Sequence, residues 1–129
     1  MTFHGHTENA GEEFLAATAL VVPTPIGLGT RVRILTAFSY GCPVVAHGAN
    51  ALGIPELAHG DNVLLGNSAD ELADGIVRIT GDLALRRRLE DGGRATFERS
   101  FAPGVAAERL VELLGSISAG RARPRAAPV

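Results

Sequence analysis

The stretch VVPTPIGLGTRVRILTAFSYGCPVVAH, residues 21–47, decides the fold. An apolar strand leads into a Gly-Leu-Gly turn, after which Thr30 caps a helix that Gly41 ends before a second apolar strand. Arg31 and Arg33 lie in the first turn of this helix, where the partial positive charge of the helix dipole disfavours a cation by about 0.3–1 kcal/mol. The helices expected near residues 12, 68 and 82 place Asp or Glu in the first turn instead. We therefore expect an anion at the start of this one helix.

The remaining sequence alternates short apolar runs with amphipathic stretches, a pattern typical of βα units on a parallel sheet. Strands are expected near residues 2–5, 19–23, 43–46 and 62–65. From Ser68 the pattern is helical: a Ser68-x-x-Glu71 capping box opens one helix, Asp82 opens the next, and a third spans residues 104–117 with its apolar residues on one face. The predicted fold class is α/β, a partial Rossmann-like parallel sheet of about four strands flanked by helices.

Length and composition indicate one domain whose surface is not strongly charged. The 129 residues suffice for a single core, and a formal charge of -2 with 5% aromatic residues does not favour nucleic-acid binding. The chain has a single cysteine, Cys42, which excludes an internal disulfide. Its first residues lack the basic segment followed by an apolar one that is typical of a signal peptide. We therefore expect a cytoplasmic protein. No apolar run is long enough for a transmembrane helix. Residues 119–129 are expected to form a disordered tail; peripheral membrane contact through its arginines is a weaker alternative to a solvated end.

The Gly-Leu-Gly turn suits a phosphate group. Two glycines let the backbone approach a ligand closely, and the free N–H groups of the first helical turn then point at it. At helical spacing, Arg33, Thr36 and Tyr40 share a face with Gly29 and could form one wall of a cleft. On the residues of the turn alone, a tight turn with solvated arginines is an equal alternative, because a lone Gly-x-Gly is a weak motif.

Residues 2–118 resemble the C-terminal, nucleotide-sugar-binding domain of GT-B glycosyltransferases of the retaining group 1 type. The pieces that carry the resemblance occur in the family's order: TFHG, the Pro-x-x-x-Gly-x-Gly-x-Arg-x-Arg turn, AFSYGCPVVA, GIPELAHGDNVLL and ADELADGIVRI. The resemblance implies an activity, transfer of a sugar from a nucleotide diphosphate to an acceptor with retention and without a bound metal or other cofactor. It divides the chain into a partial donor-binding domain, residues 1–118, and the tail, residues 119–129.

The resemblance also implies the donor-binding residues. The diphosphate would lie at the helix N-terminus formed by Gly27, Leu28, Gly29 and Thr30, with Arg31 and Arg33 adding positive charge. The base would lie near the loop that contains Gly5, and Glu56 matches the glutamate of the family's Pro-Glu pair. In the family's Glu-x7-Glu motif, Leu28 and Thr36 stand where glutamates are usual, so Thr36 offers the ribose one hydroxyl in place of a carboxylate.

The resemblance covers only part of a GT-B enzyme. The acceptor domain and the first strands of the donor domain, with the family's other phosphate-binding Arg and Lys, have no counterpart here. We therefore expect no catalysis by the chain alone, and a partner that is either a separate N-terminal half or a second copy. The alternative is a non-catalytic remnant or protein-interaction module that keeps only the fold.

Other candidate sites are weaker. His4 and His6 alternate on an expected strand but lack further ligands at metal-binding spacing, so no metal site is predicted. His47 and His59 flank the loop that contains Glu56, for which a loop acid without a ligand is an equal alternative. Ser39, Ser68 and Asp70 form no nucleophile elbow. The basic run Arg86 to Arg88 is expected to be a solvated helix face.

Overall fold

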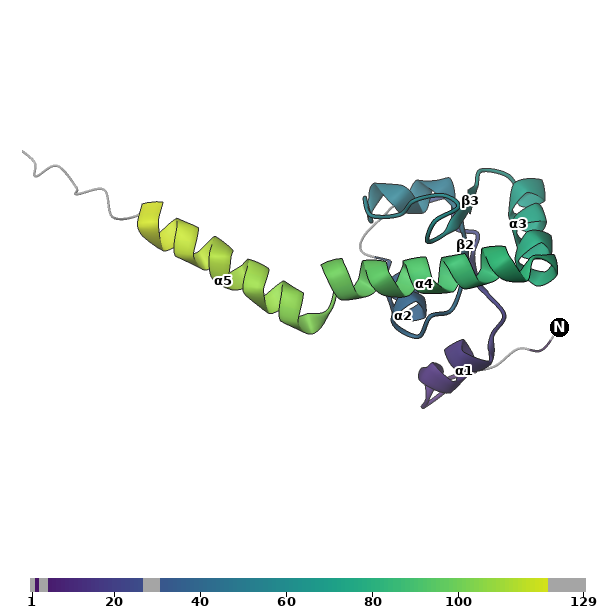
Figure 1. Ribbon diagram of the computed structural model, residues 1–129, viewed down its shortest axis with the longest axis horizontal. Coiled ribbons are helices and arrows are strands. Elements are labelled where there is room, and N and C mark those ends of the chain that lie inside the picture. The colour runs from purple at the N-terminus through teal and green to yellow at the C-terminus, as the bar shows by residue number, and fades with distance from the viewer. Residues whose placement is uncertain (1, 3–4, 27–30, 121–129) are drawn as a thin grey trace, which may run out of the picture.

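The computed structural model describes residues 2, 5–26 and 31–120, which form a three-stranded parallel sheet with helices on both faces (Figure 1). The strand order is β1-β2-β3, with Val21 opposite Val45 and Ala46 opposite Leu65. The elements follow one another as α1 (Ala10–Ala16), β1 (Leu20–Val22), α2 (Val32–Ser39), β2 (Val44–His47), the 3-10 helix η1 (Gly48–Leu52), β3 (Leu64–Gly66), α3 (Ala69–Gly81), α4 (Leu83–Ser100) and α5 (Pro103–Gly120).

The predicted α/β class is confirmed, but the number of strands differs from the expectation of about four. Three of the expected strands are present within the described residues. The exception is the strand expected near residues 2–5. Thr2 and Gly5 do not belong to a strand, and residues 3 and 4 lie outside the described residues. The strand β1 is therefore an edge of the described sheet.

The two faces of the sheet carry separate hydrophobic cores. Side chains alternate between the faces along a strand, so Val44 and Ala46 of β2 point to one side and Val45 to the other. The first side packs against Phe38 and other residues of α2, and the second against Leu72 and Ile79 of α3. Both faces of β2 are apolar because a parallel sheet is covered on both sides.

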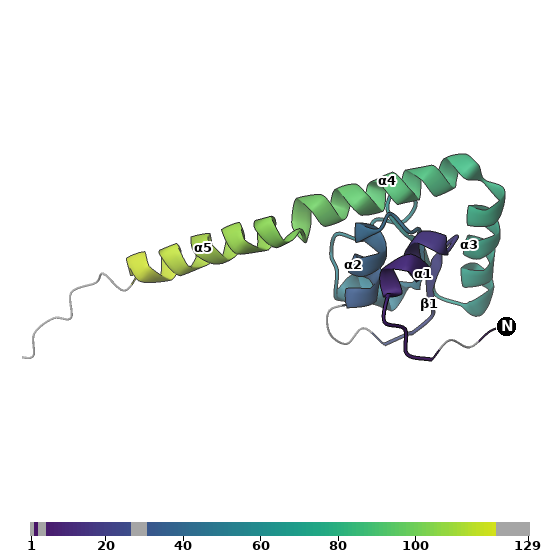
Figure 2. The same cartoon turned by 90° about the horizontal axis from the view of Figure 1, so that it is seen from below.

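Helix α4 joins the two cores. It runs from the end of α3 past α2 (Figures 1 and 2). Leu85 and Leu89 of α4 belong to the core on the α3 side, whereas Phe97 packs against the core on the α2 side. At the crossing, Gly93 lies against Phe38, which is fully buried, and an added Cβ would stand 2.8 Å from the Phe38 Cδ1. This close approach fixes α2 on the sheet.

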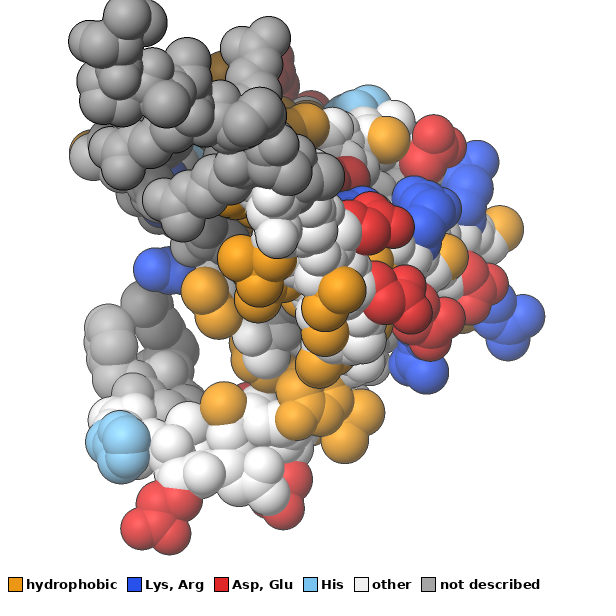
Figure 3. Space-filling model, turned by 90° about the vertical axis from the view of Figure 1, so that its left-hand side faces the viewer, with side chains coloured by type: hydrophobic (Ala, Val, Ile, Leu, Met, Phe, Trp, Pro, Cys, Tyr) orange, Lys and Arg blue, Asp and Glu red, His pale blue; other side chains and the backbone are white. Residues whose placement is uncertain are grey.

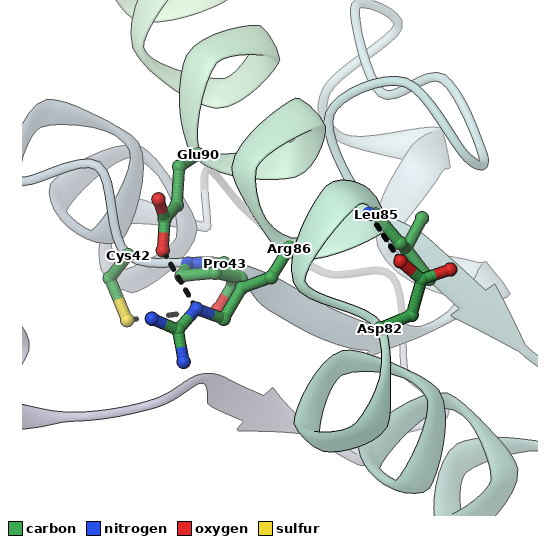
Figure 4. A network of polar contacts seen from close by, with 6 residues as sticks. All are labelled: Cys42, Pro43, Asp82, Leu85, Arg86 and Glu90. Carbon is green, nitrogen blue, oxygen red and sulfur yellow. Dashed lines mark hydrogen bonds and ion pairs between the residues drawn. The ribbon is translucent and has the colours of Figure 1, made fainter.

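Local capping sets the starts of α3 and α4, as the sequence predicts. The Ser68 hydroxyl oxygen accepts a hydrogen bond from the Glu71 N–H at 3.2 Å, and the Glu71 carboxylate accepts one from the Asn67 N–H at 2.6 Å. The Asp82 carboxylate accepts from the Leu85 N–H at 2.9 Å (Figure 4). The Ser68 and Asp82 bonds each satisfy a donor that a helix N-terminus leaves free, and the Asn67 bond fixes the residue that precedes the cap of α3.

Helix α2 begins differently. Arg31 is its N-cap residue and makes no capping hydrogen bond through its side chain. Thr30, the cap predicted from the sequence, lies outside the described residues. The predicted end is confirmed: Gly41 has a φ of +67°, a conformation that favours glycine, and its N–H donates to the Phe38 carbonyl oxygen.

The C-terminal helix α5 extends away from the rest of the molecule (Figures 1 and 2). It spans Pro103–Gly120 and so includes residues 119 and 120, which were expected in the tail; residues 121–129 lie outside the described part. None of the helices that the structure describes is long and apolar enough to cross a membrane.

Candidate functional site

The candidate site lies at the carboxyl ends of the parallel strands, where open α/β sheets commonly bind ligands. β1 leads there into residues 23–26, β2 leads into η1, and α2 starts close by at Arg31. Four of the predicted donor-binding residues, Gly27, Leu28, Gly29 and Thr30, lie outside the described residues. The site is therefore described from the segments that flank this turn.

Arg31 carries the clearest polar feature of the site. Its Nε and Nη2 atoms are buried and have no hydrogen-bond partner among the described residues. Burying donors of a charged group without a partner costs free energy, and an anion would offset that cost with short, charge-assisted hydrogen bonds. Arg33 lies two residues further along α2 and is exposed. The arrangement therefore offers one sheltered and one solvated guanidinium at the start of the same helix.

Asn50, in η1 directly after β2, is the second polar residue at this end of the sheet, and sequence reasoning missed it. The side chain is fully buried, and its Nδ2 donates to the carbonyl oxygens of His47, at 2.8 Å, and Thr24, at 3.4 Å. Asn50 thus ties the exit of β1 to the exit of β2. Its Oδ1 is buried without a hydrogen-bond partner among the described residues. An acceptor after β2 and guanidinium donors at the start of α2, each without a hydrogen-bond partner among the described residues, favour a ligand that carries both donors and acceptors.

The turn after β2 is held tightly around Asn50. The His47 Nδ1 accepts a hydrogen bond from the Ala49 N–H at 3.1 Å, which caps η1. A Cβ added at Gly48 would meet the Oδ1 at the end of the exposed Asn67 side chain beyond β3, so glycine lets this side chain approach the turn without shifting. His47 is therefore a capping residue on the rim of the site.

Thr36, Glu56 and Gly5, predicted from the family resemblance, occupy three different environments. Thr36 is half-buried on α2, and its hydroxyl donates to the Val32 carbonyl oxygen at 2.9 Å, so that oxygen can offer a ligand only acceptor capacity. Glu56 is half-buried in the loop between η1 and β3. Gly5 is exposed, with open space around its Cα.

The loop that contains Glu56 is fixed by Asn62, a second residue that the sequence reasoning missed. The buried Asn62 side chain donates to the Glu56 carbonyl oxygen and to the Thr96 Oγ1, each at 2.9 Å, and accepts from the Ala58 N–H at 2.8 Å. Asn62 and Thr96 are separated by 34 positions in the sequence. Glu56 therefore stands on a loop anchored to α4.

Tyr40 does not share a cleft with Arg33, contrary to the expectation from helical spacing. It lies at the far end of α2 and stacks on Phe14 of α1, with ring centroids 5.9 Å apart. There it lines a separate cavity of about 230 Å³ at the amino ends of the strands, together with Cys42, Arg86 and Glu90. The Arg86 Nε lies 3.2 Å from the Glu90 Oε1 (Figure 4). Burial raises the pKa of the Cys42 thiol, so this thiol is a poor nucleophile.

A metal centre has no support in the described part of the chain. No group of three or more His, Cys, Asp or Glu side chains there is arranged to hold a metal ion. His6 is exposed, and His4 lies outside the described residues. The His59 Nδ1 accepts a hydrogen bond from the Leu65 N–H at 3.0 Å, which gives this ring a structural role.

Comparison with known proteins identifies the family. Residues 1–82 match the glycosyl transferases group 1 family, and this span contains the strands, the arginine turn, Asn50 and the loop with Glu56. No curated protein matches the chain. Because the match covers more than half of the 129 residues, the chain belongs to the group 1 glycosyltransferases.

Proposed function

We propose that this chain is the donor-binding part of a group 1 glycosyltransferase and that it holds a nucleotide-diphosphate sugar at the carboxyl ends of β1 and β2. The observation that carries the proposal is the half-buried Arg31 side chain, whose Nε and Nη2 are buried and lack a hydrogen-bond partner among the described residues. Family membership supports a sugar-nucleotide donor as the source of the anion. The negative charge of the diphosphate then balances both the guanidinium and the positive end of the α2 dipole.

Each part of the donor is bound by different residues of the site. Arg31 and the backbone of residues 27–30 bind the diphosphate, and the exposed Arg33 adds charge that steers the donor to the site. Asn50, whose Oδ1 has no hydrogen-bond partner in the described part of the chain, accepts a hydrogen bond from a sugar or ribose hydroxyl. Thr36 lies near the ribose and Glu56 near the sugar, whereas Gly5 leaves room for the base.

The chain supplies donor binding and needs a second protein surface for sugar transfer. Transfer requires an acceptor site and groups that stabilise the leaving diphosphate as charge develops on it. Arg31 and Arg33 supply part of that charge. We propose that a separate N-terminal half provides the acceptor site. A remnant that keeps the fold without binding a nucleotide is the second candidate; the absence of glutamates at positions 28 and 36 favours it.

Calorimetric titration of the full chain with UDP, GDP and their sugar conjugates separates these two candidates. We expect one of these ligands to bind, and Arg31→Ala to weaken binding by tenfold or more, about 1.4 kcal/mol, because it removes a sheltered charge-assisted contact. The matched control is Arg87→Ala, which removes an exposed arginine from α4 and should leave binding unchanged. A folded chain that binds none of these nucleotides would support the remnant.

A further inference from the structure

Helix α4 contacts two separate parts of the candidate site within one helical turn. Gly93 lies against Phe38 of α2, the helix that begins with the site's arginines. The neighbouring Gly92 lies against the loop between η1 and β3, residues 53–63, which we call the Glu56 loop. A Cβ added at Gly92 would collide with the main-chain carbonyl oxygen of Asp61, so the loop and α4 approach this closely only at a glycine. The helix thereby fixes α2 and the Glu56 loop relative to each other.

The side chain of Thr96, one turn after Gly92, makes a polar contact with the same loop. Its hydroxyl oxygen accepts a hydrogen bond from the Asn62 Nδ2 at 2.9 Å, and the same Nδ2 also donates to the Glu56 carbonyl oxygen at 2.9 Å. The Asn62 Oδ1 accepts from the Ala58 N–H at 2.8 Å. Because an amide side chain has two N–H donors, Asn62 keeps none for a ligand.

The buried pair and Glu56 differ in what they can offer a donor molecule. Thr96 and Asn62 are only 2% and 4% exposed, so a ligand in the site does not reach them. Glu56 is half-buried, and in the described part of the chain its carbonyl oxygen is bonded by Asn62 while no hydrogen bond or ion pair involves its carboxylate. A carboxylate accepts hydrogen bonds from sugar hydroxyls. Thr96 and Asn62 therefore act on a ligand only through the position of Glu56.

The position of α4 is itself fixed at several points. Leu85 and Leu89 lie in the core on the α3 side, and Phe97 packs against the core on the α2 side. The following helix α5, which projects towards the viewer in Figure 3, contributes no residue to either core. The support that α4 gives to the Glu56 loop is therefore independent of α5.

We propose that Thr96 and Asn62 are positioning residues for the sugar of the donor. They hold the Glu56 loop so that the Glu56 carboxylate meets the sugar hydroxyls while Arg31 binds the diphosphate. This role rests on the proposed function, because it requires a donor at the carboxyl ends of β1 and β2. The contact with α4 then contributes to the affinity for the sugar, and the start of α2 to the affinity for the diphosphate, so substitutions can separate the two affinities.

Calorimetric titration of the full chain with UDP and GDP, each free and as a sugar conjugate, measures both affinities. Thr96→Val keeps the shape of the side chain and removes the acceptor of the Asn62 Nδ2. We expect the affinity for the sugar conjugate to fall about fivefold, and that for the free diphosphate to change by less than about twofold. Thr96→Ser keeps the hydroxyl and should keep the wild-type ratio of the two affinities. The matched control is Thr80→Val, the same change at an exposed position of α3, which should leave both affinities unchanged.

A double-mutant cycle tests whether Thr96 acts through Glu56. Glu56→Ala should lower the affinity for the sugar conjugate and leave that for the free diphosphate unchanged. In this background Thr96→Val should cause no further loss, because the carboxylate that Thr96 positions is gone. Far-UV circular dichroism at the titration temperature checks that each variant is folded.

Several results would overturn the inference and leave the proposed function intact. They are an unchanged ratio of the two affinities in Thr96→Val, a loss in Thr96→Ser as large as in Thr96→Val, and an additive loss in the Glu56→Ala background. Glu56→Ala leaves the buried pair in place, so an unchanged ratio in this variant overturns the inference even if Thr96→Val does not fold. A folded wild-type chain that binds none of these nucleotides would overturn both the inference and the proposed function.

Discussion

Gly93→Ala tests how α4 positions the helix that carries Arg31. In the structure the new Cβ stands 2.8 Å from the Phe38 Cδ1 and 3.2 Å from its Cε1, closer than carbon atoms approach without displacement. Phe38 is fully buried and cannot move into solvent. Overpacking of this kind costs about 1–3 kcal/mol. Alanine regains up to about 1 kcal/mol over glycine inside a helix. We expect a net loss of about 1 kcal/mol in the free energy of unfolding.

Urea denaturation followed by circular dichroism measures this loss. The matched control is Gly81→Ala at the end of α3, where the new Cβ meets nothing within 4 Å and stability should rise slightly or stay unchanged. A double-mutant cycle then assigns the cause. In a Phe38→Leu background, the smaller side chain leaves room for the Cβ, so Gly93→Ala should lose less there.

The reasoning is refuted if Gly93→Ala stabilises the protein as much as Gly81→Ala does. It is also refuted if the cost of Gly93→Ala is the same with Leu at position 38. Either result would mean that α2 and α4 are not in the close contact described, and that the start of α2 is fixed by something other than this crossing.

Three further predictions concern stability. Asn62→Ala should cost about 2–3 kcal/mol in urea denaturation, since it removes three hydrogen bonds of a buried side chain, whereas Thr96→Val, which removes one of them, should cost less; equal costs would contradict the assignment. Ser68→Ala and Asp82→Ala should each cost about 1 kcal/mol through a lost N-cap, and a cost near zero for both would mean that the caps do not hold these helices. Burial raises the pKa of the Cys42 thiol, so at high pH the native state keeps a proton that the unfolded chain releases. The contribution of this thiol to the free energy of unfolding is therefore complete below about pH 8.5 and falls as the pH rises further. The fall in the free energy of unfolding should be smaller in Cys42→Ala than in the wild type. An identical decline in both proteins would contradict it.

The features that local sequence determines could be predicted. The caps at Ser68 and Asp82 and the left-handed Gly41 depend on residues within a few positions of each other, so the bounds of α3, the start of α4 and the end of α2 followed from the chain itself. The apolar runs at β1, β2 and β3 predicted a parallel sheet; β2 is buried on both faces and β3 nearly so, whereas β1, at the edge, leaves Val21 exposed. Membership of the glycosyltransferase family followed from several weak motifs in the right order.

The polar framework of the site could not be predicted, because it depends on contacts between distant segments. Asn50 and Asn62 look like ordinary loop residues in the sequence. Only the fold brings Asn62 against Thr96 and Asn50 against Thr24. Helical spacing put Tyr40 on the same face as Arg33 but did not reveal that the stacked Phe14 holds it in a different cavity. The sequence singled out Arg31 by its charge at a helix start, and the structure adds that its Nε and Nη2 are buried without a hydrogen-bond partner among the residues it describes.

Nuclear magnetic resonance titration of the ¹⁵N-labelled full chain with UDP or GDP sugars tests the central claim most directly, because it locates the ligand. The account predicts saturable shifts of the amide signals of residues 31–34 and 47–50, at the carboxyl ends of β1 and β2. Those shifts should be lost in Arg31→Ala and kept in Arg87→Ala. Shifts confined to residues 40–43 and 86–90, around the cavity at the amino ends of the strands, would contradict the proposed donor site, as would the absence of any shift in the folded chain.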